Sequence, residues 1–224
     1  MIPVRLPPLT YGLIRSLRNL LAALIFGAVP ALAEPLTLVA LGDSLTAGYG
    51  LPEGDGFVPQ LQEWLTANGA DVVVVNAGVS GDTTAGGLSR VDWTLTPEVD
   101  AMIVTLGGND MLRGIDPATS RANLDAILTK AAERELPVLL IGLRAPGNYG
   151  AAFKTAFDAM YPELAAKHGV DLETNFFIPL IDQSTRLLAT DLMQRDGLHP
   201  SAKGVAVVVA AIGPKVLTLL EKVK

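Results

Sequence analysis

Five short aliphatic runs recur along this chain, and they constrain its fold more than any other feature. They lie at residues 36–41, 72–75, 101–106, 137–143 and, more weakly, 170–178. Each run is apolar at successive positions, which is typical of strands in a parallel sheet with both faces covered. Five strands are too few for an eight-stranded barrel. The pattern therefore predicts an α/β fold, a doubly wound three-layer α/β/α sandwich around a five-stranded parallel sheet.

The segments between these runs have apolar residues at helical spacing. Helices are expected at residues 57–65, 117–131, 150–168 and 201–224, the last with a kink at Pro214. The chain contains no internal repeat and no linker that would mark a boundary, so we expect a single domain over residues 34–224.

The first 33 residues have the order of a secretory signal peptide. Arg5, Arg15 and Arg18 precede an apolar core at 20–29, and a small-residue cleavage site ends at Ala33. The core is too short to span a bilayer, and the chain has no cysteine to carry a lipid anchor or a disulfide. We therefore expect cleavage after Ala33, no stable membrane anchor, and a periplasmic or secreted protein.

The charge of the predicted mature chain limits its partners. Removal of the leader leaves 14 lysines and arginines against 23 aspartates and glutamates, a net charge near −9. No basic cluster is present, so the composition argues against nucleic acid as a partner. We expect a monomer that acts on a small molecule.

Polar residues follow the predicted strands at the points where the strands end. They occupy residues 42–44, 76–82, 107–110 and, ahead of the last helix, 196–200. The carboxyl ends of parallel strands meet at one rim, and ligands bind there in such folds. A serine, several glycine amides, a carboxamide and an aspartate–histidine pair are therefore expected to converge.

Serine, histidine and aspartate in this arrangement indicate nucleophilic catalysis. A serine hydroxyl is a weak nucleophile that needs an adjacent base, and His199 is one of two histidines in the chain. An acceptor must hold the other ring nitrogen, and Asp196 is three residues away. The second histidine, His168, ends a predicted helix, where a surface residue favoured by the helix dipole is the simpler interpretation. Ser44, His199 and Asp196 thus form a candidate triad.

Acyl transfer also requires N–H donors directed at the developing oxyanion. The backbone amide of Gly81 has no side chain to obstruct it, and the Asn109 carboxamide supplies a second donor. The amide of Ser44 supplies a third. Each donor follows a different predicted strand.

The sequence contains little that supports a competing motif. Thr46 replaces the second glycine of G-x-S-x-G, so the α/β-hydrolase elbow is absent, and no phosphate-binding glycine loop is present. Asp43, Asp82, Asp110 and Asp196 leave a Mg²⁺-dependent phosphohydrolase as an alternative. Each polar turn alone is more often structural than catalytic. Their joint order along the chain favours catalysis.

This order of blocks resembles the GDSL or SGNH hydrolase family. The matching residues are Gly42 to Leu45, Gly81, Asn109, and Asp196 with His199. The segments ALGDSLTAGYGL, NAGVSGDTTAGGL, LGGNDMLRGIDP and RAPGNYG are most similar to the bacterial periplasmic thioesterase, lysophospholipase and arylesterase group. The resemblance implies a flavodoxin-like sandwich, with Ser44 as nucleophile, His199 as base, Asp196 as its orienting group, and Gly81 and Asn109 as oxyanion donors. It also implies activity on acyl esters and thioesters, with no metal and no cofactor.

The acyl-binding residues are a separate expectation. Leu112, Ile115, Pro146 and Tyr149 lie in predicted loops that would border the rim. We expect them to line the acyl site, unless they merely pack these loops. Two other functions stay open, a carbohydrate O-acetylesterase on the same scaffold and a non-catalytic lipid-binding or glycan-binding module.

Overall fold

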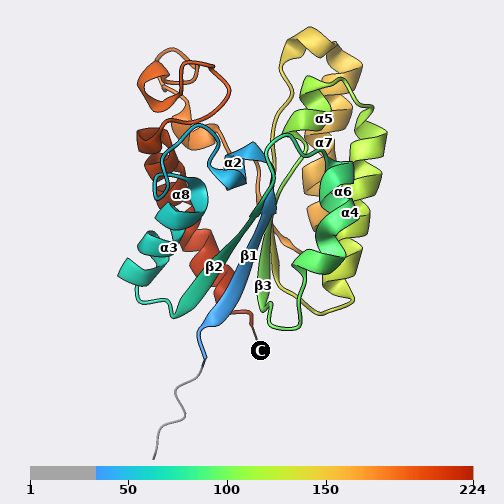
Figure 1. The fold of residues 1–224 in the computed structure, drawn as a ribbon. Coiled ribbons are helices and arrows are strands. Elements are labelled where there is room, and N and C mark those ends of the chain that lie inside the picture. Colours follow the sequence, from blue (N-terminus) through green and yellow to red (C-terminus); the bar gives the residue numbers. More distant parts are fainter. Residues whose placement is uncertain (1–33, 224) are drawn as a thin grey trace, which may run out of the picture. The chain divides into compact units, whose positions relative to one another are not determined.

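Residues 34–223 are described by the structure, a computed structural model, and they form an open β-sheet with helices on both faces (Figure 1). The predicted signal peptide lies outside these residues. The strands are β1 (Leu36–Gly42), β2 (Val72–Gly78), β3 (Ala101–Thr105), β4 (Val138–Ile141) and β5 (Asp171–Glu173). Their order is β2-β1-β3-β4-β5, and all neighbours are parallel. This flavodoxin-like order confirms the predicted sandwich.

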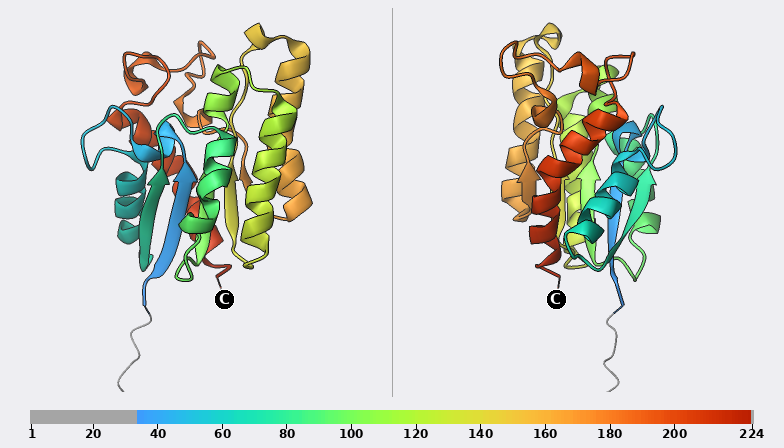
Figure 2. Two further views of the ribbon diagram at one scale, coloured as in Figure 1. Left: turned by 45° about the vertical axis from the view of Figure 1, so that its right-hand side comes forward. Right: turned by 90° about the vertical axis from the view of Figure 1, so that its left-hand side faces the viewer.

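Helices form the two outer layers. One layer contains α3 (Phe57–Ala67) and α8 (Ala202–Leu220), and the other contains α4 (Thr84–Thr94), α6 (Pro117–Ala132) and α7 (Ala151–His168) (Figures 1 and 2). Two short helices, α2 (Ser44–Ala47) and α5 (Gly108–Leu112), begin at strand ends. By length and composition α8 could cross a membrane, but half of its most apolar window is buried in this fold. It packs as a core helix against α3.

The central strands are apolar at successive positions because helices cover both of their faces. All five residues of β3 and all four residues of β4 are buried. The edge strand β2 differs, since Val73 and Val75 are 47% and 42% exposed. Two-sided burial therefore holds for the middle of the sheet but not for this edge.

The two largest differences from the predicted boundaries are at the ends of the last strand and the last helix. The last strand occupies only three residues, because the chain after Glu173 leaves the sheet in a turn. In that turn the Asn175 side chain accepts a hydrogen bond from the Phe177 N–H at 3.2 Å. The last helix continues through Pro214 and ends at Leu220, short of the predicted end.

The strand register sets the rim on which the site is built. Gly42 at the end of β1 pairs with Gly78 of β2 and with Thr105 of β3, so the segments that follow leave the sheet at one level. Glycine is required at position 42, because a Cβ there would lie 2.0 Å from Thr46 Oγ1. The polar segments after β1, β2 and β3 therefore share one rim, as the sequence predicts.

Candidate active site

Ser44 occupies the first position of α2, directly after β1 and its capping residue. The cap is Asp43, which is 2% exposed and whose Oδ1 accepts a hydrogen bond from the Leu45 N–H at 3.0 Å. Gly48 ends the helix after one turn in a left-handed conformation, with φ at 83°. The tight turn presents the Ser44 hydroxyl at the rim.

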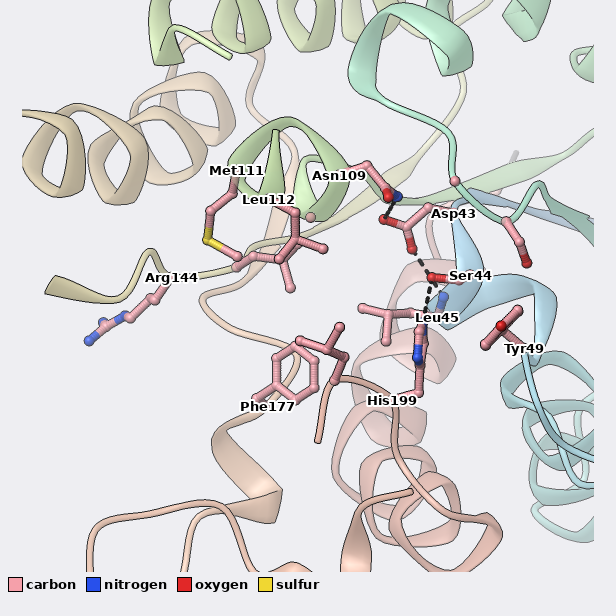
Figure 3. A pocket seen from close by; sticks show the side chains of 15 residues that line it. Asp43, Ser44, Leu45, Tyr49, Asn109, Met111, Leu112, Arg144, Phe177 and His199 are labelled. Atoms are coloured by element: carbon pink, nitrogen blue, oxygen red, sulfur yellow. Dashed lines mark hydrogen bonds between the residues drawn. The ribbon is translucent and has the colours of Figure 1, made fainter. Parts of the chain in front are cut away.

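Ser44, His199 and Asp196 lie in one hydrogen-bonded row. His199 Nε2 is 2.8 Å from Ser44 Oγ (Figure 3), and His199 Nδ1 is 2.6 Å from Asp196 Oδ2. The other carboxylate oxygen, Asp196 Oδ1, accepts the backbone N–H groups of Leu198 at 2.9 Å and His199 at 3.0 Å. The imidazole is thus held at both ring nitrogens.

The Asp196 carboxylate stays ionised over any neutral or mildly acidic range. Its pKa is lowered from 3.8 to about 2, first by the hydrogen bond to the His199 side chain and then by the His199 backbone N–H. A charged acceptor on Nδ1 keeps the proton on that nitrogen, so Nε2 is free to accept one from Ser44.

Two residues that the sequence did not single out support the histidine. The Tyr49 ring lies beside the imidazole with its centroid 4.8 Å away. Gln194 Nε2 donates to the carbonyl oxygens of Tyr49 at 2.8 Å and Pro200 at 3.0 Å, and the Gln194 N–H donates to His199 O at 2.8 Å. These contacts join segments about 145 residues apart, and no local pattern signals them.

The predicted oxyanion donors surround the same serine. The N–H groups of Ser44 and Gly81 have no hydrogen-bond acceptor within residues 34–223, and both residues line the cavity above the triad. Gly81 adopts a φ of 87°, which an L side chain rarely tolerates. Two unfilled backbone donors beside a serine can receive a developing negative charge.

The Asn109 carboxamide is the third member of this set. Its Nδ2 donates to Asp82 O at 2.9 Å and faces Asp43 Oδ2 at a long 3.4 Å. The first contact fixes the amide orientation, whereas the second is weak at that distance. One N–H of Asn109 is therefore available to another acceptor in the cavity.

A single arginine on α4 joins the two loops that carry Ser44 and Gly81. Arg90 Nη2 donates to Gly42 O at 2.8 Å, Nη1 donates to Ala77 O at 2.7 Å, and Nε pairs with Asp82 Oδ2 at 2.7 Å. Gly42 lies two residues before the serine, and Asp82 lies one residue after Gly81. The guanidinium thus ties the turn of the nucleophile to the loop of the Gly81 amide.

We expect Arg90→Lys to lower kcat for an acyl ester by up to about a hundredfold with little change in KM. Lysine keeps the charge but cannot make three divergent hydrogen bonds, and a misplacement of about 1 Å carries a cost of this size. Steady-state kinetics measure the effect, and millimolar guanidinium should restore part of the rate to Arg90→Ala. A lowered thermal midpoint together with a lowered kcat that guanidinium does not restore would instead indicate damage to the fold.

Asp43 is a buried carboxyl beside the nucleophile. Its pKa is raised from 3.8 to about 6, chiefly by desolvation, although the Leu45 N–H and His199 act in the opposite direction. The folded state therefore binds this proton more tightly than the unfolded chain does. Its contribution to stability is fully present below pH 3.8 and is lost as the pH rises through about 6.

Asp43→Asn should stabilise the protein at alkaline pH relative to acidic pH. Asparagine stays neutral and can still accept from the Leu45 N–H. The free energy of unfolding of the variant, compared with the wild type, should shift in its favour by up to about 3 kcal/mol between pH 4 and pH 8. Urea unfolding at the two pH values measures this. The same difference at both values would contradict a raised pKa at Asp43.

The cavity above Ser44 has a volume of about 340 Å³ and mostly apolar walls. The apolar side chains are those of Leu45, Tyr49, Met111, Leu112, Leu143, Phe177 and Leu198. Leu112 and Leu198 are about half exposed, so the cavity is open to solvent at its mouth. Such walls suit a hydrocarbon chain beside the nucleophile.

The four residues expected to bind the acyl chain are placed differently by the structure. Leu112 lines the cavity, but Ile115, Pro146 and Tyr149 are not among its lining residues. Tyr149 instead stacks on Phe153 of α7, with ring centroids 4.9 Å apart, which draws this loop toward the helix. The geometry therefore gives no support to an acyl-binding role for these three.

The second histidine, His168, lies outside the active-site cavity. His168 pairs with Asp125 through Nε2 at 2.6 Å at the end of α7, away from the cavity, which fits the structural interpretation.

The four aspartates considered as metal ligands have separate partners, namely Leu45 N for Asp43, Arg90 for Asp82, Thr84 and Ser120 for Asp110, and His199 for Asp196. Within residues 34–223 no group of three acidic or histidine side chains is arranged to hold a metal ion. The geometry does not favour a metal-dependent phosphohydrolase.

Comparisons with known proteins identify the family of this chain. The sequence profile of the GDSL-like Lipase/Acylhydrolase family matches residues 40–207. The chain is 38% identical to esterase TesA of Pseudomonas aeruginosa over 84% of its own length and 91% of the relative's. It is 37% identical to thioesterase 1/protease 1/lysophospholipase L1 of Escherichia coli K12, over 74% and 76% of the two chains. The crystal structure of AlinE4, an SGNH-hydrolase family esterase, matches with a TM-score of 0.69 and 42% identity over 84% of this chain and 98% of that one.

Proposed function

Because this chain belongs to the GDSL-like lipase/acylhydrolase family, we propose that it hydrolyses carboxylic esters and thioesters of acyl chains through an acyl-enzyme at Ser44. The observation that carries the proposal is the 2.8 Å contact between Ser44 Oγ and His199 Nε2. A serine hydroxyl within hydrogen-bond reach of an oriented imidazole is the arrangement that nucleophilic acyl transfer requires.

In the first half-reaction, His199 takes the Ser44 proton as Oγ attacks the scissile carbonyl. The imidazolium that forms is stabilised by the Asp196 carboxylate, and it then protonates the departing alcohol or thiol. In the second half-reaction, His199 activates a water molecule, which releases the acid and regenerates Ser44. The nearby apolar walls, including Leu45 and Leu112, are suited to hold the acyl chain.

The tetrahedral intermediate places a negative charge on the former carbonyl oxygen. The amides of Ser44 and Gly81 are free to donate to it, and Asn109 Nδ2 can supply a third hydrogen bond. These donors come from the ends of three adjacent strands. Their positions are set before substrate binds, so little reorganisation accompanies charge development.

Asn109→Ala should lower kcat by about a hundred to a thousandfold, because one oxyanion donor is lost. KM should change little, since this hydrogen bond strengthens only in the transition state. Turnover of a p-nitrophenyl ester measures the effect, with Asn68→Ala, at the end of α3 and outside the cavity, as the matched control. A drop of less than tenfold would argue against Asn109 as an oxyanion donor.

A fluorophosphonate probe and a series of substrates test the proposal as a whole. We expect a stable adduct on Ser44, detected by mass, and hydrolysis of esters and thioesters across acyl lengths from acetyl to palmitoyl. Acetate release from acetylated polysaccharide, without turnover of longer acyl chains, would indicate a carbohydrate O-acetylesterase. An absence of both adduct and turnover would indicate a binding module.

Export is proposed on the leader alone. The predicted signal peptide at residues 1–33 lies outside the described residues, so cleavage after Ala33 and a periplasmic or secreted location stay predictions, as does the monomeric state. N-terminal sequencing of the mature protein and its mass in solution test them. A mature chain that begins near Glu34 is the expected result.

A further inference from the structure

Arg144 lines the active-site cavity and pairs with no carboxylate of residues 34–223. Its guanidinium has no hydrogen bond or ion pair within residues 34–223, and the residue is exposed. Apart from Arg186 and Arg195, every other arginine and lysine of that range binds a carboxylate or a carbonyl oxygen, as Arg121, Lys154 and Lys222 do. Of the three free arginines, Arg144 alone lines this cavity.

The backbone at Arg144 is held firmly in place. Leu143, which precedes it, is 3% exposed, and Ala145, which follows it, is 2% exposed. The Ala145 N–H donates to Asp158 Oδ1 at 2.8 Å, and Lys154 Nζ donates to Ala145 O at 2.6 Å and to Asp158 Oδ2 at 2.7 Å. The carboxylate that binds the neighbouring Ala145 N–H is therefore already paired with Lys154, and the Arg144 guanidinium has no partner within residues 34–223.

The position of Arg144 in the cavity is opposite to the reacting atoms. Figure 3 shows it on the far side of the drawn pocket from Ser44, His199 and Tyr49, with its guanidinium extending away from these residues at the outer edge, and Met111 and Leu112 also line the cavity. A substrate that reaches from the serine to the arginine thus lies along apolar side chains for part of its length.

The net negative charge of the molecule makes an unpaired arginine at this cavity unusual. The chain from residue 34 onward has a net charge near −9, so its general field does not attract anions. A free guanidinium beside apolar walls is a local exception. Arginine binds carboxylate and phosphate with two parallel N–H donors, and partial removal from water strengthens such contacts.

We propose that Arg144 binds an anionic group, a carboxylate or a phosphate, that the ester substrate carries at a distance from its scissile carbonyl. The inference rests on the proposed esterase function and names the substrate class of that same site. The anion has two possible sources. It can stand at the far end of the acyl chain, or it can belong to the leaving alcohol.

Matched pairs of substrates separate the two sources. In the first arm, p-nitrophenyl hexanoate, octanoate and decanoate are compared with the p-nitrophenyl monoesters of adipate, suberate and sebacate, which carry a carboxylate in place of the terminal methyl group. In the second arm, the hexanoyl ester of butanol is compared with that of 3-hydroxypropyl phosphate. We expect the wild type to favour the anionic member of at least one pair by about tenfold in kcat/KM, the scale of one charge-assisted hydrogen bond.

Arg144→Gln should abolish that preference and leave kcat/KM for the neutral esters within about twofold. Arg186→Gln is the matched control, because Arg186 is a free, exposed arginine that lies outside the cavity. It should keep the preference, and added salt should weaken the preference in the wild type. Neutral esters turned over with no anionic preference in either arm, or a preference that survives in Arg144→Gln, would overturn the inference and leave the esterase function intact. A loss of all turnover and of the Ser44 adduct would instead count against the esterase function.

Discussion

Ser44→Ala lowers kcat about a million-fold and leaves the fold intact: this is the largest effect that we expect. Removal of Oγ deletes the atom that attacks the carbonyl, and His199 then has no proton to accept. In serine hydrolases the nucleophile and base act as a unit, so the loss of either costs about as much as the loss of both. The remaining rate reflects the oxyanion donors and substrate binding alone.

A set of variants distinguishes the loss of the nucleophile from a general loss of structure. His199→Ala should fall to a similar rate, and the double variant should fall no further. Ser89→Ala is the matched control, since Ser89 is an exposed serine of α4 whose Oγ bonds only the Gly86 carbonyl. Its kcat should stay close to that of the wild type. Additive losses in the double variant, or near-full ester turnover by Ser44→Ala, would refute the assignment of the nucleophile.

The parts of the site that sequence could predict are those that depend on the ends of strands. Aliphatic runs identify parallel strands, and parallel strands bring their carboxyl ends to one rim. Ser44, Gly81 and Asn109 each follow such an end, so their convergence is a consequence of the sheet and needs no knowledge of loop shape. His199 joins them because the pair with Asp196 stands directly before α8, which packs beside the sheet.

The parts that sequence could not predict depend on loops whose course is set by distant contacts. The segment after β4 illustrates this, because Tyr149 stacks on Phe153 and leaves the cavity that it was expected to line. Tyr49 and Gln194 meet beside His199 across most of the chain. The role of Arg90 could not be predicted either, because a mid-helix arginine in an amphipathic pattern is ordinarily a surface residue. Only the fold places its guanidinium between two strand ends.

Asp196→Asn should lower kcat by about ten thousandfold, the second largest effect that we expect. The reason lies in how the two carboxylate oxygens are used. One accepts two backbone N–H groups, from Leu198 and His199, and the other accepts His199 Nδ1. The single oxygen of asparagine can satisfy only one of these sides. If it stays with the two backbone groups, the amide NH₂ faces Nδ1, which must then become an acceptor.

That exchange reverses the tautomer of the imidazole. The ring proton moves to Nε2, the nitrogen that faces Ser44, and His199 can no longer accept the serine proton. Steady-state turnover of a p-nitrophenyl ester from pH 5 to pH 9 measures the loss. Asp191→Asn is the matched control, because this nearby aspartate pairs only with Lys203 at the surface.

The pH profile separates the charge of Asp196 from its role in orienting the imidazole ring. The pKa of Asp196 is lowered to about 2, so this carboxylate stays charged across the whole measured range. A fall in wild-type activity toward pH 5 would therefore not come from protonation of Asp196. Asp196→Asn should be deficient even at the alkaline end, because a misplaced proton is not corrected by a higher pH in this range. Recovery of wild-type turnover at pH 9 would show that Asp196 acts through charge alone and does not orient the ring.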